Sequence, residues 1–416
     1  MRVLLISANT ERIHMVTVPL GLGLVAAALR QAGHQVRFLD LLGAEDLPEA
    51  VRSAIAAGRP EAIGISIRNI DDQNAQSPRF LLEQARDVVA ACRSHSAAPV
   101  VLGGAGYSIF PRAALDYLGA DYGIRGDGET AFPALLERLR AGLDPRDIPG
   151  VHVAGQAGGG GRAQAADLDR LPLWDPALDG YALQGEDIWV PVQTRRGCPN
   201  DCSYCSTARI QGRGLRCRSP RQVLATMAAL ARQGFRKFYF VDNNFNVPAA
   251  EAAELCAGLL AMDARLAWRC ILYPSNVGEG LVRAMAAAGC VEASIGFESG
   301  CEAVLRGMNK HFTPEEVRRT LGLLARYGIR RIGFLLLGGP DETRDTVAES
   351  IAFARSLDLD ALRVTVGIRI YPDTPLARRA VADGLAAPDD DLLRPRFYLA
   401  PGLEPWIHGA VAGLAF

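Results

Sequence analysis

Short apolar runs alternate with helical patterns over the first third of the chain. The runs that predict strands are Val3–Ser7, Val36–Leu41, Ala62–Ile67, Pro99–Leu102 and Tyr122–Ile124. Helical patterns fall between them, at 19–32, 48–57 and 81–92, and a fourth begins near Gly126 and runs to Leu139. Strands that alternate with helices in this way predict a doubly wound parallel sheet, an α/β fold that binds ligands beyond the carboxyl ends of its strands.

The same alternation continues after Trp189. The strands expected there are Val190–Thr194, Lys237–Val241, Trp268–Leu272, Val291–Gly296, Arg331–Leu337 and Arg363–Ile370. Ser219-Pro220 and Thr313-Pro314 each begin a capping box with proline at the first helical position. Six parallel βα units over about 180 residues are too few for an eight-fold barrel, so we expect an open, partial (β/α)6 barrel.

These patterns divide the chain into four parts. We expect a Rossmann-like domain over 1–150, a linker over 151–185, the barrel over 186–380 and an apolar tail over 381–416 that caps the barrel mouth. Residues 155–164 read GQAGGGGRAQ, and four consecutive glycines gain no packing, which is typical of a loop or linker tip. A long turn within one hairpin explains this stretch equally well.

The composition is that of an ordinary globular protein. The formal net charge is −1 and 22% of the residues are charged, so no global field favours nucleic acid as a partner. No stretch approaches 18 consecutive apolar residues, and no secretory cleavage site follows the N-terminus. We expect a cytoplasmic protein without a transmembrane segment and without a nucleic-acid partner.

Nine cysteines, an odd number without a secretion signal, indicate reduced thiols. Three of them, Cys198, Cys202 and Cys205, lie within one segment directly after the first barrel strand, where a barrel builds its active site. Thiolates spaced four and three residues apart can converge on one metal centre from a single loop, and such thiolates hold iron–sulfur clusters. With three ligands, one iron of a [4Fe–4S] cluster keeps an open position. That iron can bind the amino and carboxylate groups of S-adenosylmethionine (SAM) and reduce its sulfonium, which yields a 5′-deoxyadenosyl radical.

A structural zinc site is the alternative for this cluster, with Cys217 as the fourth ligand. Structural zinc usually needs paired CxxC or CxxH elements, and the sequence contains no second pair. A zinc-stabilised binding protein is therefore the non-enzyme alternative.

The segment CxxxCxxC, with the aromatic Tyr204 before its third cysteine, resembles the hallmark of the radical SAM superfamily. The resemblance covers about residues 186–380 and implies SAM contacts at successive strand ends. The implied contacts are Tyr204 of the cysteine motif itself and Asp242 and Asn243 at the end of the second strand, where the superfamily holds the methionine end of SAM. At the fourth strand the implied contacts are Glu298, as acceptor of the ribose hydroxyls, and Ser299, and at the fifth strand Gly338, beside adenine. Glu298 also fits a structural carboxylate, and the glycine pair at 338 also fits a plain strand-to-helix turn.

A doubly wound domain before this barrel resembles the cobalamin-binding radical SAM enzymes, in which cobalamin lies between a flavodoxin-like domain and the barrel mouth. The resemblance rests on three segments, namely Pro19–Leu22, the turn at Gly103 and Gly104, and Gly126–Glu129. It implies Gly103, Gly104, Gly126 and Glu129 as cobalamin contacts, because glycines let the backbone approach a macrocycle or its nucleotide tail. Glycine turns also occur in domains of this fold that bind other ligands or none.

The histidine segment DxHxxG of other cobalamin folds is absent, and His14 lacks the aspartate two positions before it. We therefore expect the lower face of cobalt to lack a histidine ligand. Arg68 and Asn69, just beyond the third strand, are placed to approach that face, although a solvated loop arginine explains Arg68 as well.

The resemblance implies a methyltransferase that acts on an unactivated carbon or phosphorus of a small-molecule, lipid or peptide substrate, with an external flavodoxin- or ferredoxin-like electron donor. Ring closure or rearrangement without net methylation is an alternative. A methylthiotransferase would carry a second three-cysteine cluster in its first domain, where this chain has Cys92 alone. The tail aromatics Phe397, Tyr398 and Trp406 are expected either to shape the substrate pocket or to belong to the core.

Overall fold

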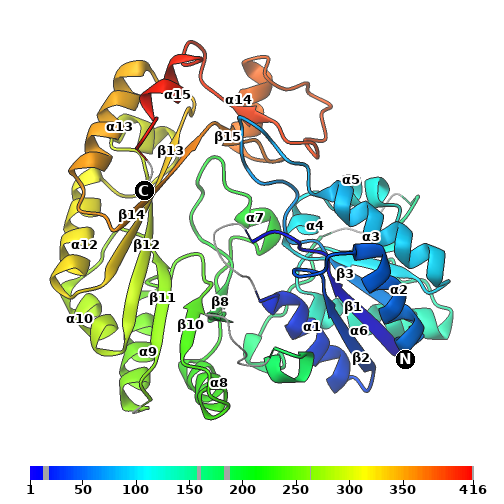
Figure 1. The fold of residues 1–416 in the computed structure, drawn as a ribbon. Helices are drawn as coiled ribbons and strands as arrows, with labels where there is room; N and C mark the ends of the chain where they lie inside the picture. Colours follow the sequence, from blue (N-terminus) through cyan, green and yellow to red (C-terminus); the bar gives the residue numbers. More distant parts are fainter. Residues whose placement is uncertain (13–17, 157–160, 182–187, 263, 415–416) are drawn as a thin grey trace.

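The computed structural model describes residues 1–12, 18–156, 161–181, 188–262 and 264–414. Two α/β domains lie side by side, the first drawn in blue and cyan and the second in green to orange (Figure 1). His14, Ala157 and the first three of the four consecutive glycines, at 158–160, lie outside the described residues. No helix in the described part of the chain has both the length and the apolar character needed to cross a bilayer.

The first domain is built on a six-stranded sheet in the order β2-β1-β3-β4-β5-β6. Its strands are β1 (Arg2–Ser7), β2 (Gln35–Asp40), β3 (Ala62–Ser66), β4 (Val100–Gly103), β5 (Tyr122–Ile124) and β6 (Val151–Val153). The five strands β1–β5 are parallel, which confirms the doubly wound fold, and β6 is antiparallel to β5. Residues 151–153, expected at the start of the linker, therefore complete this sheet instead.

Helices cover both faces of the first sheet. They are α1 (Leu20–Gln31), α2 (Leu47–Gly58), α3 (Leu82–His95), α4 (Ala105–Ile109), α5 (Pro111–Leu118) and α6 (Gly128–Ala141). Helices α1 and α6 pack on each other through one apolar cluster that includes Leu29, Phe132 and Leu135. Helices α2, α3 and α5 form the layer on the opposite face of the sheet.

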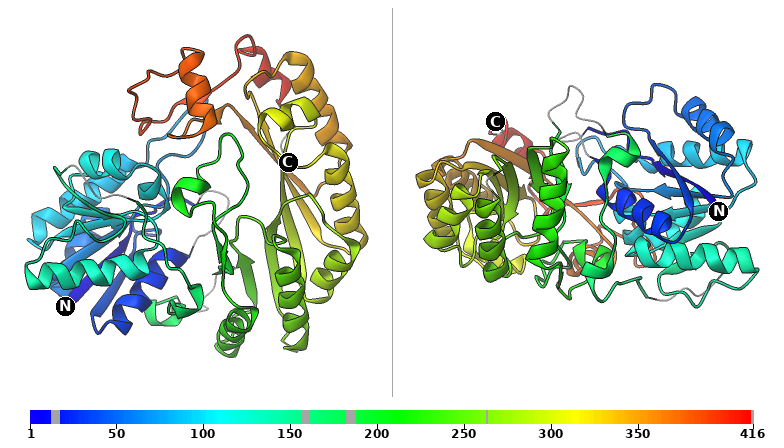
Figure 2. Two further views of the ribbon diagram at one scale, coloured as in Figure 1. Left: turned by 180° about the vertical axis from the view of Figure 1, so that it is seen from behind. Right: turned by 90° about the horizontal axis from the view of Figure 1, so that it is seen from below.

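The second domain is a six-stranded, fully parallel, open barrel in the order β14-β13-β12-β11-β10-β7. Its strands are β7 (Val190–Val192), β10 (Lys237–Phe240), β11 (Ala267–Leu272), β12 (Cys290–Glu298), β13 (Arg330–Leu337) and β14 (Ala361–Val366). The helices of its outer layer are α8 (Pro220–Arg232), α9 (Ala249–Ala261), α10 (Glu279–Ala287), α12 (Pro314–Arg326) and α13 (Arg344–Ser356). Figure 2 shows α12 and α13 on the side away from the first domain, whereas α8 lies at the barrel edge next to it, so the concave face of the barrel turns toward that domain. The predicted partial barrel is thus confirmed.

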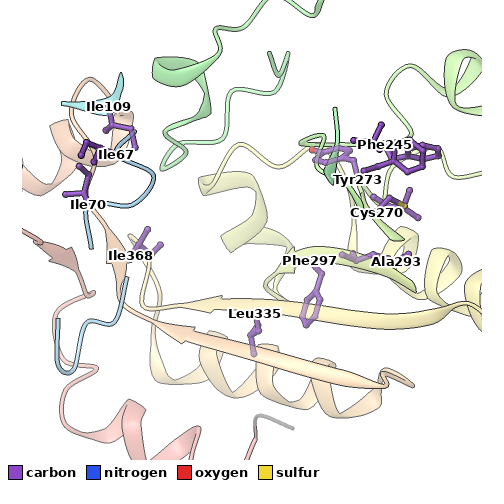
Figure 3. Packing of buried hydrophobic residues seen from close by; sticks show 14 of the residues in the cluster. Ile67, Ile70, Ile109, Phe245, Cys270, Tyr273, Ala293, Phe297, Leu335 and Ile368 are labelled. Atoms are coloured by element: carbon purple, nitrogen blue, oxygen red, sulfur yellow. The ribbon is translucent and has the colours of Figure 1, made fainter. Parts of the chain in front are cut away.

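Alternation along the barrel strands explains this arrangement. Phe238, Trp268 and Phe297 are fully buried and point to the helix layer, whereas the residues between them are only partly covered. Figure 3 shows Phe297 and Leu335 of adjacent strands directed to the same side. Strands that are buried on one face and partly open on the other are what a half-open barrel requires, because its concave face must admit ligands.

The two predicted capping boxes form to different extents. Thr313 and Glu316 make the complete reciprocal box at α12. At α8, Ser219 accepts from the backbone N–H of Gln222, but the Gln222 amide turns away and donates to the carbonyl of Asp169. The second box is therefore only half formed, because a linker carbonyl takes the amide that would close it.

The tail packs over the end of the sixth barrel strand. Its elements are β15 (Ile368–Arg369), α14 (Pro375–Ala382), β16 (Phe397–Tyr398), antiparallel to β15, and α15 (Trp406–Ala410). Tyr398 is fully buried and donates to Asp383 at 2.6 Å, so it belongs to the core of the tail. Arg369 pairs with Asp71 of the first domain at 2.7 Å and donates to the carbonyls of Leu392 and Leu393, so one buried guanidinium joins both domains and the tail.

Candidate functional site

A cavity of about 430 Å³ lies at the carboxyl ends of β1, β3, β4 and β5. Its inner part is apolar and passes between α1 and α6, where Val101 and Phe132 line it. Its mouth faces the barrel, with Gln193 and Arg196 on the far wall. The cavity lies where a doubly wound sheet binds its ligand, and its apolar depth suits a flat heterocycle better than a charged group.

The glycines around this cavity are there for two different reasons. A Cβ added at Gly103 would meet nothing closer than 3.9 Å, and one added at Gly21 would meet nothing within 4 Å, so side chains there would fill the cavity. Gly104 and Gly126 both have φ of +98°, and a Cβ would lie 2.5 Å from the Ile67 carbonyl oxygen and 2.3 Å from the Ala163 carbonyl oxygen, respectively. The backbone thus needs glycine at Gly104 and Gly126, whereas Gly21 and Gly103 leave room for a ligand.

Glu129 lies at the start of α6 and is committed to an ion pair. Both of its oxygens accept from Arg196, and the same guanidinium contacts Asp127 at 2.9 Å. Asp127 also pairs with Arg216 and accepts from the backbone N–H of Ala165. Arg196 and Arg216 come from the hairpin of β8 (Arg195–Arg196) and β9 (Arg216–Cys217) that flanks the cysteine segment. The acidic start of α6 therefore anchors the barrel to the first domain at the cavity wall.

Arg68 and Asn69 follow β3, on the side of the domain that faces the barrel. Arg68 lines the cavity and its side chain stays accessible, while the surrounding protein lowers its pKa by desolvation. Pro191 and Val241 of the barrel line the same cavity as Arg68. Asn69 lines a separate, small hollow beside α3 and does not line the cavity.

The three motif cysteines lie on a loop that the β8–β9 hairpin brackets. Gly197 has φ of +92°, and a Cβ there would lie 2.1 Å from the Gly214 carbonyl oxygen, so only glycine lets the loop cross its own return strand. The loop is then held by the bond from Cys198 N to the Gly212 carbonyl at 3.1 Å and by the bond from Cys205 N to the Cys202 carbonyl at 3.2 Å. These bonds fix the backbone of all three cysteines in one turn.

The three thiols are close enough to influence one another. Burial raises the pKa values of Cys198 and Cys202, and the charge of Cys205 adds to both shifts. Within the described ranges, no three His, Cys, Asp or Glu side chains are close enough to ligate one metal ion together. A [4Fe–4S] cluster needs a wider arrangement, because each thiolate binds a different iron corner. Three half-buried thiols on one wrapped loop fit that requirement.

Three polar residues follow β10 and face in different directions. Asp242 is fully buried; its oxygens accept from Thr194 N, Thr194 Oγ1 and Arg195 N, at 2.6 to 3.1 Å, and desolvation raises its pKa. Asp242 therefore braces the strand before the cysteine loop and has no free oxygen toward a ligand. Asn243 and Asn244 face the loop, where Asn244 Nδ2 lies 3.5 Å from Cys198 Sγ.

Glu298 ends β12 at a β-bulge and has φ of +59°, an unusual value for a residue other than glycine. Its carboxylate accepts from Lys310 Nζ at 3.0 Å, and both side chains are largely buried. The Lys310 ammonium also lies 5.2 Å from the centre of the Tyr204 ring. The bulge therefore aims Glu298 at the cysteine loop, as the sequence predicts for a SAM-contacting residue, but the structure adds a buried cation between them.

Ser299 and Gly338 lie next to the site and are used by the fold. The Ser299 hydroxyl is 2.7 Å from that of Ser350 on α13 and accepts from Cys301 N, so it faces the helix layer. Gly338 has φ of +96°, and a Cβ there would lie 2.5 Å from Leu399 of the tail. Its backbone N–H donates to Glu342 at 2.6 Å. Ser299 thus positions the end of β12, and Gly338 the contact with the tail.

Sequence reasoning missed three residues of the site. Gln211 accepts from Gly197 N and Asn243 Nδ2 at 3.0 and 2.9 Å while it lines the cavity, so it connects the cysteine loop with the first domain. Lys310 and Asn244 are the other two. Lys310 lies on the turn between α11 (Glu302–Gly307) and α12, and nothing in its local pattern distinguishes it from a solvated lysine. Asn244 is the third polar residue after a buried strand. It could have been predicted, because ligands of such folds bind beyond the carboxyl ends of the strands.

Comparison with known proteins agrees with this geometry. Residues 192–354 match the Radical SAM superfamily and residues 6–136 match the B12 binding domain. The chain is 26% identical over 439 residues to tryptophan 2-C-methyltransferase of Streptomyces laurentii, covering 89% of this chain and 73% of that protein. It is also 26% identical over 376 residues to an uncharacterized methyltransferase of Pyrococcus horikoshii, covering 88% and 79%.

A solved structure extends the likeness over the whole chain. The radical SAM methyltransferase TsrM from Kitasatospora setae, with tryptophan substrate and the SAM analogue aza-SAM bound, superposes with a TM-score of 0.88 and 25% identity, covering 100% of this chain and 88% of that one. A second structure of TsrM, which shows the same fold with a TM-score of 0.85 at 23% identity, contains cobalamin and a [4Fe–4S] cluster. The chain described here is therefore a member of the cobalamin-binding radical SAM enzymes, with a B12 binding domain followed by a radical SAM domain.

Proposed function

We propose that this protein uses cobalamin and a [4Fe–4S] cluster to methylate an unactivated carbon or phosphorus of a small-molecule substrate, with SAM as the source of both the radical and the methyl group. Its relatives support the class of reaction, because both named sequence relatives and the matched structure are methyltransferases. The substrate is taken up separately below.

The observation that carries the proposal is the contact between the two cofactor sites through Gln211. This residue lines the cavity of the first domain and also accepts from Gly197 N, one residue before the first motif cysteine. Arg209, on α7 (Thr207–Ile210), donates to the Ile109 carbonyl of α4 at 2.9 Å and holds the same loop against the first domain. A cysteine loop that is fixed to the wall of the cavity in the B12 binding domain suits a reaction shared between two cofactors.

The residues present fit both groups. Cys198, Cys202 and Cys205 would hold the cluster, with Tyr204, Asn243 and Glu298 around SAM. Residues that line the cavity would hold cobalamin, with the open backbone at Gly21 and Gly103 leaving room for it and Arg68 on the cavity wall. Asp242, Ser299, Gly338, Gly104, Gly126, Glu129 and Asn69 would act by holding these elements in place.

When bound, the cluster supplies the electron that cleaves SAM, and cobalamin carries the methyl group. The protein orients the reactants and excludes water. Two buried ion pairs at the domain boundary, Arg196 with Glu129 and Arg369 with Asp71, would help to exclude water.

Anaerobic reconstitution with iron and sulfide tests the proposal. We expect about four irons per chain and, with SAM, cobalamin and a reductant, formation of 5′-deoxyadenosine and methylated cobalamin. Alanine in place of Cys198, Cys202 or Cys205 should abolish cluster assembly. Cys217→Ala is the matched control, because this half-buried cysteine lies on the neighbouring strand β9. Full iron loading in all three motif variants, or loss of metal binding in C217A, would overturn the cluster assignment and favour the zinc alternative.

A further inference from the structure

The concave face of the barrel carries two rows of side chains at different heights. The lower row consists of Tyr239, Arg269, Glu292 and Arg330, which are register partners on four adjacent strands. The upper row consists of Gly296, Phe334 and Arg363 on β12, β13 and β14. Because Gly296 precedes Glu298 on the same strand, the upper row lies next to the Glu298–Lys310 pair and the cysteine loop.

Charges in the lower row are already paired. Arg269 stacks between the rings of Trp189 and Tyr239, 4.3 and 4.9 Å from their centres. Glu292 lies 3.8 Å from Arg269 and 3.4 Å from Arg330. Each charged side chain of this row therefore already has a partner within the row, so the row has no evident need of a ligand.

The upper row has the opposite character. Phe334 is 37% exposed, and it is the one Phe, Tyr or Trp in the exposed class among the residues that the structure describes. Arg363 is exposed on the adjacent strand, and it has no ion pair or hydrogen bond to any described residue. An exposed ring beside an unpaired guanidinium, on a face that points into the space between two domains, is the arrangement expected of a ligand site.

Gly296 completes the upper row. A Cβ at this position would lie 2.7 Å from Glu298 Oε1, so any side chain would displace the carboxylate that faces Lys310. Without a side chain, the backbone at Gly296 is a flat surface beside the Phe334 ring. Glycine inside a strand often marks the close approach of a ligand, and a planar group fits this space better than a branched one.

We propose that the upper row binds a carboxylic acid with a flat, apolar body, with Arg363 pairing the carboxylate and Phe334 and Gly296 contacting the body. Arginine binds a carboxylate through two parallel hydrogen bonds, and a single unpaired guanidinium matches a single negative charge. This inference rests on the proposed function to the extent that the bound acid is the molecule that is methylated. Its position next to the Glu298–Lys310 pair places the acid beside the residues proposed to surround SAM.

A matched pair of probes tests the proposal without requiring turnover. 1-Naphthylacetate carries the charge and the flat body, and 1-naphthylacetamide carries the body alone. Binding to the full chain, both reconstituted and as purified, is followed by ligand-observed saturation-transfer NMR. We expect the acid to bind about tenfold or more tightly than the amide, because a hydrogen bond to a charged group favours the charged ligand by that factor.

Three variants then assign the contacts. Arg363→Gln should remove the preference for the acid while binding of the amide is unchanged. Phe334→Ala should weaken acid and amide alike, by about tenfold, because the contact of the ring is apolar. Arg330→Gln is the control, since Arg330 is also exposed on this face but is paired with Glu292, and it should leave the preference intact.

Equal binding of acid and amide by the unmodified protein, or a preference that survives in R363Q, would overturn the inference. Iron content and SAM cleavage, measured on the same samples, separate this result from failure of the proposed function. A protein that loads the cluster but shows no preference contradicts this inference alone. A protein without a cluster whose acid preference is lost in R363Q contradicts the proposed function alone.

Discussion

Arg196 donates to both carboxylate oxygens of Glu129 across the boundary between the two domains, at 3.2 and 2.5 Å. Arg196→Met should lower the free energy of unfolding by about 3 to 5 kcal/mol, because the change leaves the buried Glu129 carboxylate without its cation, while Asp127 keeps its pair with Arg216. Urea unfolding measures the loss. Arg52→Met removes an exposed pair with Glu49 and should leave the midpoint unchanged. Equal midpoints for the two variants would show that the buried pair contributes no more to the free energy of unfolding than the exposed pair does.

The Glu342 carboxyl predicts a pH dependence of stability. Desolvation raises its pKa to about 7, although the N–H groups of Gly339 and Gly338 oppose the shift, and its Oε1 has no hydrogen-bond partner in the described part of the chain. The folded state therefore keeps a proton that the unfolded state loses near pH 4.5. This contribution is complete at low pH and is lost as the pH rises toward 7, by about 3 kcal/mol.

Glu342→Gln removes this titration. The stability of E342Q relative to the unmodified protein should therefore increase between pH 5 and pH 8, as measured by urea unfolding at a series of pH values. Parallel stability curves for the two proteins would mean that the Glu342 carboxyl titrates normally.

The Glu298–Lys310 pair predicts a strong coupling. Lys310→Met leaves a largely buried carboxylate without its cation and should lower the free energy of unfolding by about 3 kcal/mol. The double variant K310M/E298Q should recover part of that loss, since the uncompensated charge is gone. A double-mutant cycle in chemical denaturation measures the coupling, and strict additivity of the two single changes would contradict it. Arg306→Met, which removes an exposed pair within α11, is the control.

Substitutions at the adjacent residues Gly103 and Gly104 should have different effects, the first on cobalamin binding and the second on stability. Gly103→Val places a side chain in the cavity and should reduce cobalamin uptake, followed by visible absorption, with little change in thermal stability. Gly104→Ala forces a Cβ to within 2.5 Å of the Ile67 carbonyl at φ of +98°, so it should lower the free energy of unfolding by about 1 to 2 kcal/mol or more. Unchanged cobalamin uptake by G103V would exclude this cavity as the cobalamin site.

Strand and helix positions were predictable where burial repeats with a clear period. β5 was placed at Tyr122–Ile124, and every expected barrel strand exists within a few residues of its predicted ends. β6 was missed because Val151–Val153 is three residues long and its antiparallel pairing depends on a strand that precedes it by almost 30 residues, a distance too long for local patterns to indicate.

Site residues were predictable where the motif fixes the backbone, as in the cysteine loop. They were not predictable where a side chain chooses between two faces. Asp242 and Asn243 are adjacent after one strand, yet Asp242 turns into the protein because Thr194 and Arg195 offer it three hydrogen bonds. Tyr398 fitted both the substrate pocket and the core in the sequence, because the sequence does not show which way its side chain points. Its hydrogen bond to Asp383 holds it in the core.

Arg369 connects the C-terminal tail to the first domain. Its guanidinium donates to the Asp71 carboxylate of the first domain and to the carbonyls of Leu392 and Leu393. A chain that ends before Leu392 would lose these two carbonyls, so Arg369 would hold the loop at Asp71, more than 300 positions earlier in the sequence, less firmly. Such a chain should melt in two separate calorimetric transitions, one for each half, where the intact protein melts as a unit.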